Sequence, residues 1–79
     1  MPAKEYSYTV FFQRVSKGGY IVTVPVFPGL VVEANDMEEA REAARTAIRA
    51  YINELVKGGQ PIPQEEKTVQ EKISVMVML

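Results

Sequence analysis

The stretch DMEEAREAARTAIRAYINELVK, residues 36–57, decides the fold, because its apolar residues recur at helical rather than strand spacing. Asp36 is a suitable N-cap, Glu39 follows it at capping-box spacing, and Gly58 is expected to supply the left-handed residue that ends the helix. A buried side so rich in alanine lets the helix lie close to a sheet. That side carries Ala40, Ala43, Ala44, Ala47, Ile48, Tyr51, Ile52, Leu55 and Val56.

Four other segments alternate apolar and polar residues, as strands with one buried face do. They span residues 6–15, 20–24, 30–34 and 72–79. Gly18 and Gly19 favour a hairpin between the first two strands. Prolines are not tolerated inside a strand, so the segment from Pro25 to Gly29 is predicted to be a connection.

The predicted element order is three strands, the helix and a last strand. A right-handed crossover through the helix places the last strand beside the first and parallel to it, which gives the spatial order 3-2-1-4. The sequence therefore predicts a single α+β domain over residues 1–79. It consists of a three-stranded antiparallel meander, a helix on one face and a fourth strand parallel to the first.

The two faces of this predicted sheet differ in apolar content, and the richer face is assigned to the helix. That face carries Tyr8, Val10, Phe12, Val22, Val24, Leu30, Val32, Val75 and Val77. The opposite face still exposes Phe11, Ile21, Val31, Met76 and Met78. We predict that this face, or a strand edge, makes a homo-oligomer contact in a dimer or tetramer. The alternative is a half-exposed sheet face, since scattered apolar residues on a surface are common.

Composition narrows the chemistry that the chain can perform. The 79 residues contain no Cys and no His, which removes thiol nucleophiles, disulfides and the commonest metal ligand and general base. The net charge of −1 argues against binding nucleic acid or anionic membranes through bulk charge. No apolar run reaches the roughly 20 residues of a membrane span. We expect a cytoplasmic protein without catalytic residues, metal or cofactor.

Three arginines, Arg41, Arg45 and Arg49, are spaced by four residues and form a positive stripe on the helix. One interpretation is a solvated face in which Glu38 and Glu42 pair with these arginines. The other is a contact surface for an acidic partner or for RNA phosphates.

The connection between the second and third strands also has two interpretations. Its prolines and glycine can simply fix a sharp passage, or Val26 and Phe27 can be displayed to a partner. Tyr6, Tyr8 and Tyr20 are interpreted as core residues rather than base-stacking residues.

Four short motifs in one order resemble the HicB antitoxin family. Within residues 18–29 they are a Gly-Tyr strand and a P-x-x-P-G loop, followed by an acidic helix start at 35–40 and a G-x-P-I-P exit at 59–63. The helix segment 44–51 matches as well. The resemblance covers about residues 6–65. Many family members continue into a DNA-binding domain, whereas the residues after 65 here offer a strand, so a stand-alone member is expected.

The resemblance implies a truncated ribonuclease-H-like fold that acts by protein-protein contact. The usual partner in this family is a HicA-type toxin, an mRNA interferase, so the chain is expected to neutralise such a toxin or to be an orphan relative. An active ribonuclease H takes a metal-binding carboxylate from its first strand, but residues 6–15 contain no Asp or Glu. The alternative function is a small nucleic-acid-binding module that uses the arginine stripe.

Overall fold

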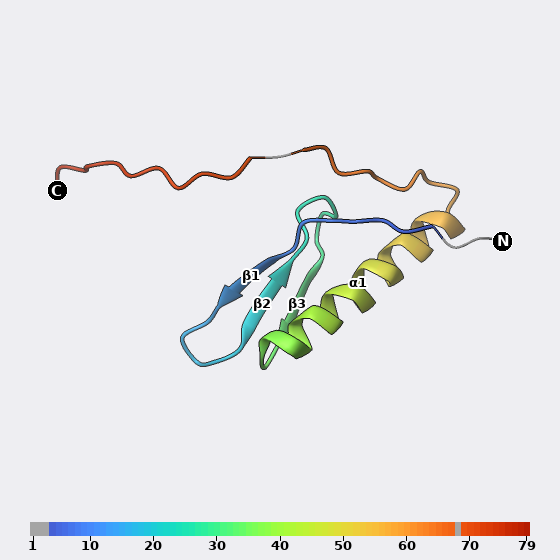
Figure 1. The fold of residues 1–79 in the computed structure, drawn as a ribbon, viewed down its shortest axis with the longest axis horizontal. Helices are drawn as coiled ribbons and strands as arrows, with labels where there is room; N and C mark the ends of the chain where they lie inside the picture. Colours follow the sequence, from blue (N-terminus) through green and yellow to red (C-terminus); the bar gives the residue numbers. More distant parts are fainter. Residues whose placement is uncertain (1–3, 68) are drawn as a thin grey trace.

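The computed structural model describes residues 4–67 and 69–79 and shows three strands followed by one helix (Figure 1). Strand β1 spans Phe11–Arg14, β2 spans Tyr20–Thr23, β3 spans Val31–Ala34 and α1 spans Met37–Lys57. The sheet is antiparallel with the order β1-β2-β3. Helix α1 packs on one face against β2 and β3. The predicted α+β meander with a helix on one face is confirmed.

Both ends of α1 are capped by local hydrogen bonds. Asp36 accepts one from the backbone N–H of Glu39 at 2.8 Å. The Glu39 carboxylate reaches back as predicted, but it accepts from the N–H of Asn35, at 3.4 Å, rather than from that of Asp36. The prediction for Gly58 is wrong, since its φ is −84° and the left-handed residue is Gly59, at +69°.

The C-terminal cap of α1 is a Schellman motif, which explains the one-residue shift. The N–H of Gly59 donates to the carbonyl of Val56 at 3.1 Å, and the N–H of Gln60 donates to that of Leu55 at 2.8 Å. This motif needs its left-handed residue immediately after the C-cap. Gly58 is the C-cap itself, so the next glycine takes that conformation.

The strands are shorter than the alternation predicts, and Pro25 explains why the first one begins late. Phe11 pairs with Thr23, so the same register would bring Thr9 opposite Pro25. A proline has no N–H to donate to a ladder. The segment before Phe11 therefore continues as extended chain outside the sheet.

Two clusters of buried residues form the core. Val22, Ala34, Ala40 and Ala44 join the sheet to the first half of α1, where alanines allow close approach. Val24, Phe27 and Leu30 form the second cluster, against the second half of α1. A 21-residue helix is about 31 Å long, whereas a four-residue strand spans about 13 Å, so α1 overhangs the sheet. The connection between β2 and β3 fills that overhang.

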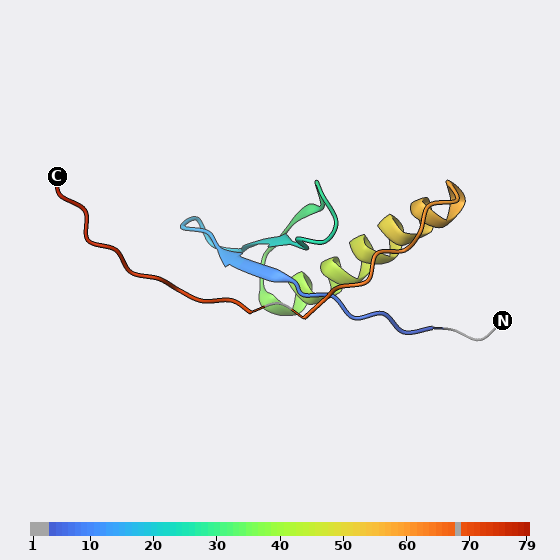
Figure 2. The same cartoon turned by 90° about the horizontal axis from the view of Figure 1, so that it is seen from above.

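The sheet and α1 together form what we call the body. Residues 69–79, which we call the arm, lie outside the sheet and extend away from the body (Figures 1 and 2). Within residues 4–67 and 69–79 the predicted fourth strand beside β1 is therefore not formed. Val75 and Val77 were assigned to the helix face but are 76% and 70% exposed. Val56, in the last turn of α1, is likewise exposed, because that turn lies beyond the sheet.

A membrane-spanning helix is not found in the described part of the chain. None of its helical structure combines the length and the apolar character that crossing a bilayer requires.

Candidate partner-binding groove

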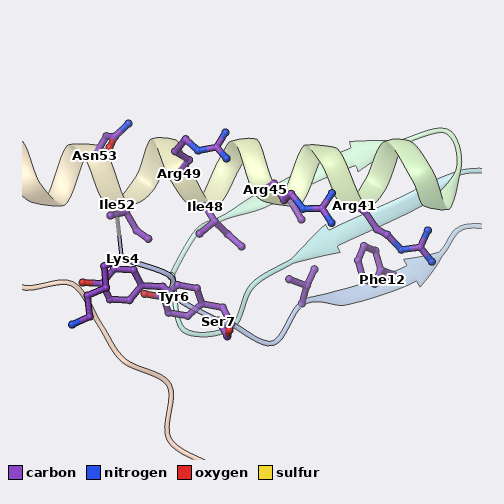
Figure 3. A pocket seen from close by; sticks show the side chains of 13 residues that line it. Lys4, Tyr6, Ser7, Phe12, Arg41, Arg45, Ile48, Arg49, Ile52 and Asn53 are labelled. Atoms are coloured by element: carbon purple, nitrogen blue, oxygen red, sulfur yellow. The ribbon is translucent and has the colours of Figure 1, made fainter. Parts of the chain in front are cut away.

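An open groove of about 750 Å³ runs between α1 and the extended segment that leads into β1 (Figure 3). It exists because the helix covers β2 and β3, while β1 lies at the edge of the sheet. The groove is lined by Lys4, Tyr6, Ser7, Tyr8, Val10, Phe12, Arg41, Ala44, Arg45, Ile48, Arg49, Ile52 and Asn53.

Helical spacing gives this groove an apolar floor and a charged rim. Ala44, Ile48 and Ile52 recur every four residues and face inward, with Ile48 and Ile52 pointing toward the N-terminal segment in Figure 3. Val10 and Phe12 supply the floor on the opposite wall. The arginine stripe, also spaced by four, follows the outer border of the same helix. An apolar floor with a cationic rim suits a partner that offers apolar and acidic groups together.

Aromatic side chains form one end of the groove. The Lys4 ammonium lies 5.3 Å from the centre of the Tyr6 ring, and the Tyr6 and Tyr8 rings are nearly parallel, with centroids 6.4 Å apart. Tyr8 meets Phe27 edge to face at 4.8 Å, and the ring of Phe27 also contacts that of Tyr51, at 4.7 Å. Tyr6 is thus held on an aromatic stack that reaches into the core.

The Tyr8 hydroxyl is fixed as a neutral hydrogen-bond donor. It donates to the carbonyl of Pro63 at 2.7 Å. Burial raises the pKa of Tyr8, and the neighbouring Tyr6 and Glu65 add smaller shifts in the same direction. This contact joins the segment after α1 to the segment before β1, and so stabilises one wall of the groove.

The rim carries more positive than negative charge. Arg45 pairs with Glu42, as predicted. The predicted pair of Glu38 with Arg41 is not formed, and within residues 4–67 and 69–79 neither Arg41 nor Arg49 makes an ion pair. Two of the three arginines are therefore available to a partner. Surface pairs of this kind contribute at most about 1 kcal/mol, so the Arg45 pair is easily exchanged for another.

The structure brings together the three predicted arginines but not the two predicted loop residues. Phe27 is 1% exposed, so the interpretation that it is displayed to a partner is wrong. The reason is the turn around it, in which Phe27 N–H donates to the Val24 carbonyl at 2.9 Å and Leu30 N–H donates to the Phe27 carbonyl at 3.1 Å. These bonds fold the ring inward, while Val26 lies half-buried near Phe11.

The predicted oligomer residues are divided between two regions. Phe11 and Val31 share one cross-strand row with Thr23 between them, and Ile21 lies in the next row of the same face. Phe11 is 39% and Val31 59% exposed. Met76 and Met78 belong to the exposed arm instead, so the five residues do not form one patch in this chain.

Lys4, Tyr6, Ile48 and Ile52 are groove residues that the sequence analysis did not identify. The strand pattern alone predicts that Tyr6 and Tyr8 are core residues. In the fold, α1 brings its arginines to the opposite wall, and Lys4 lies over Tyr6. The only sequence signal was the alternation that puts Tyr6 and Tyr8 on the same side as Phe12.

The described residues, 4–67 and 69–79, contain no group of three or more acidic side chains arranged to hold a metal ion. The groove instead offers cations, aromatic rings and apolar surface. Side chains of these kinds are suited to contact with a partner through charge and shape.

Comparison with known proteins identifies the family. Residues 8–75 match the model of the HicB-like antitoxin of bacterial toxin-antitoxin systems, so the chain belongs to this family. It is 33% identical over 76 residues to the UPF0150 protein ssr1765 of Synechocystis sp., covering 96% of this chain and 95% of that protein. It is 38% identical over 58 residues to the UPF0150 protein Ta0767 of Thermoplasma acidophilum, covering 73% and 84%. No solved structure matches the chain.

Membership of this family identifies the chain as an antitoxin-type protein, and it confirms the resemblance to HicB antitoxins. The matched region includes most of the groove, from Tyr8 through the whole of α1.

Proposed function

We propose that this chain neutralises a HicA-type mRNA interferase toxin in the cytoplasm by protein-protein contact, and that it performs no chemistry itself. The observation that carries this proposal is the family match over residues 8–75. In the HicB family the toxin is the expected partner, and the ribonuclease-H-like relationship would be one of architecture without catalysis.

The groove is our candidate for the toxin-binding surface. Its rim places Arg41 and Arg49 where they can pair with acidic groups of another protein. Tyrosine and arginine, the residue types of Tyr6 and of the rim, are enriched at binding hot spots. Truncating the three rim arginines should therefore weaken binding more than removing the same charge elsewhere.

A second candidate function is binding of single-stranded RNA, and one observation favours it. The fold places Lys4 over the half-buried ring of Tyr6 and lines the same groove with three arginines, which is the combination of cations and stacking surface that such binding uses. With a net charge of −1 the interaction would be local and strongly weakened by salt.

The test is to mix the purified chain with a purified HicA-type toxin from the same organism and to measure complex formation and RNA cleavage. We expect a stable mixed complex and loss of cleavage. The variant Arg41→Ala/Arg45→Ala/Arg49→Ala should weaken inhibition at least tenfold. The matched control, Arg14→Ala/Lys17→Ala/Lys57→Ala, removes three exposed charges outside the groove and should inhibit like the parent chain.

Two outcomes would contradict the proposal. If the chain does not bind the toxin but binds labelled single-stranded RNA with a steep salt dependence, the second function is correct. If both triple variants inhibit equally, the toxin binds elsewhere and the groove assignment is wrong.

A further inference from the structure

The arm has the sequence of a buried strand but no strand partner in its own chain. From Val75 to Leu79 it has five consecutive apolar residues, a pattern typical of a strand covered on both faces. Met76, Met78 and Leu79 are nevertheless fully exposed. Monomers rarely leave such a contiguous apolar surface in water.

The apolar residues of the arm cannot be covered by their own sheet, because the chain before the arm is attached near the start of β1. Thr9 donates from its backbone N–H to the Glu65 carboxylate at 2.7 Å and donates from its hydroxyl to the same group. Both segments run in the same direction (Figures 1 and 2). Gln70, at the start of the arm, lines a hollow with Thr9 and Phe11. Extended chains advance about 3.3 Å per residue, so the run from Val75 to Leu79 comes level with the end of β1, at Arg14, and with the hairpin after it. This apolar run therefore lies at and beyond the end of its own sheet.

The outer edge of β1 is the complementary feature. It is an edge strand, and among the described residues no backbone hydrogen bond joins it to the arm. Unpaired N–H and C=O groups at such an edge accept a further strand. The apolar floor of the groove borders the same edge, so a strand added there would have aliphatic and aromatic surface to cover on the side facing α1.

The chain also exposes far more surface than a compact monomer. Its accessible surface is 7058 Å², roughly 2,200 Å² more than the about 4,800 Å² expected for a folded chain of 8.9 kDa. Its radius of gyration is 15.7 Å, against about 11.6 Å for a compact domain of this length. A stable interface buries about 1,200–2,000 Å² in total, so the excess is large enough for one.

We propose that the arm pairs with β1 of a second copy of this chain in a two-fold, strand-exchanged dimer. A second copy is the occupant because one reciprocal contact covers both arms and both free edges. Each arm runs parallel to its own β1, and a two-fold axis perpendicular to the sheet reverses direction, so it lies antiparallel to the partner's β1. The face carrying Ile73, Val75 and Val77 covers the groove floor, and the arginine rim remains on the outside.

Light scattering on the full chain tests the dimer. The parent chain should give twice the chain mass of 8.9 kDa, and Val75→Asp/Val77→Asp should give the single mass. The matched control is Val31→Asp/Val56→Asp, at residues 59% and 58% exposed on β3 and the end of α1, which should remain dimeric. A monomeric parent chain overturns the proposal. So does a dimer that the control dissociates and the arm variant does not.

Disulfide trapping tests which strands pair, whatever the arm variant does to folding. The chain has no cysteine, so Gln13→Cys can be mixed with a differently tagged chain that carries Val75→Cys, Met76→Cys or Val77→Cys. Oxidation should link the two tags for at least one arm position. A chain with both cysteines that instead closes on itself as a monomer would show that the arm folds back, and would overturn the exchange.

Discussion

The body and the arm contain the same kinds of apolar residue, but these residues are buried in the body and exposed in the arm. Val22 in β2 is fully buried and Val77 in the arm is 70% exposed, although both lie in apolar segments with the pattern of a strand. In the body, short connections place each strand directly beside the next one. The arm is separated from the sheet by the whole of α1 and by the segment 58–66. An alternating pattern therefore predicts that a face will be covered, but it does not predict which chain covers it.

Phe27→Ala should show the largest effect, since it removes the ring that joins both walls of the groove to the core. Large-to-small substitutions of buried aromatic residues cost about 3–5 kcal/mol, which is a large share of the stability of a small domain. Met78→Ala in the arm should change the free energy of unfolding by less than about 0.5 kcal/mol. Urea titration at concentrations where light scattering gives a single chain measures both. A comparable loss for Met78→Ala would mean that the arm packs on its own body.

Gly19→Ala tests the hairpin that gives the body its immediate strand neighbours. Gly19 has φ of +89°, and a Cβ there would lie 2.7 Å from the carbonyl oxygen of Ala34. We expect a loss of about 1–3 kcal/mol from the backbone conformation plus the cost of moving β3. Gly18→Ala is the control, because φ is +94° but no atom lies within 4 Å. Equal losses of thermal stability in the two variants would show that the contact with Ala34 is unimportant.

The N-terminal cap of α1 should contribute less than the hairpin glycine. Asp36→Ala removes the acceptor for the Glu39 N–H and should cost about 1 kcal/mol in free energy of unfolding. Asp36→Asn keeps an acceptor oxygen and should lose only a fraction of that, as read from the midpoint of chemical denaturation. If Asn proves as harmful as Ala, charge rather than the hydrogen bond stabilises this end.

The smallest expected effect is at Glu65, where the chain that becomes the arm is attached to the body. Hydrogen bonds from the side chain and backbone of Thr9 lower the pKa of Glu65 below its ordinary value of 4.5. Its contribution to stability is present above that value and is lost as the pH falls through the folded-state pKa. Glu65→Gln should be less stable than the parent chain at pH 7, and the difference should shrink in acid.

Urea midpoints at pH 7 and pH 3 measure this effect, with Glu66→Gln as the control because Glu66 is the exposed neighbour. A gap between Glu65→Gln and the parent chain that widens in acid would contradict the assignment.

Local features of the fold could be predicted from the sequence, because their causes lie within a few residues. Helical periodicity and the Asp36 cap define α1, and Pro25 ends the predicted strand at Val24, one residue after β2 ends. The error at Gly58 was one residue, since the Schellman geometry depends on which glycine becomes the C-cap. The fourth strand could not be placed correctly from the sequence, because its position depends on the offset between Thr9 and Glu65, which no local pattern contains.

The groove was not predicted, although its three arginines were, because helical spacing is enough to place them on one side of α1. Whether they line a groove depends on how the extended segment before β1 lies along the helix, which no local pattern contains. Phe27 was misjudged because a connection between prolines resembles a displayed loop, whereas the overhang of α1 gives that ring a place in the core.

Backbone hydrogen exchange in the arm tests the central claim most directly. We predict that the amides of residues 75–79 exchange slowly in the parent chain at concentrations where it is a dimer, and rapidly in Val75→Asp/Val77→Asp under the same conditions. Amides of α1 provide an internal reference that should change little. Arm amides that exchange as fast as free peptide in the dimeric parent chain would contradict the claim that the arm is a strand completed by a second copy.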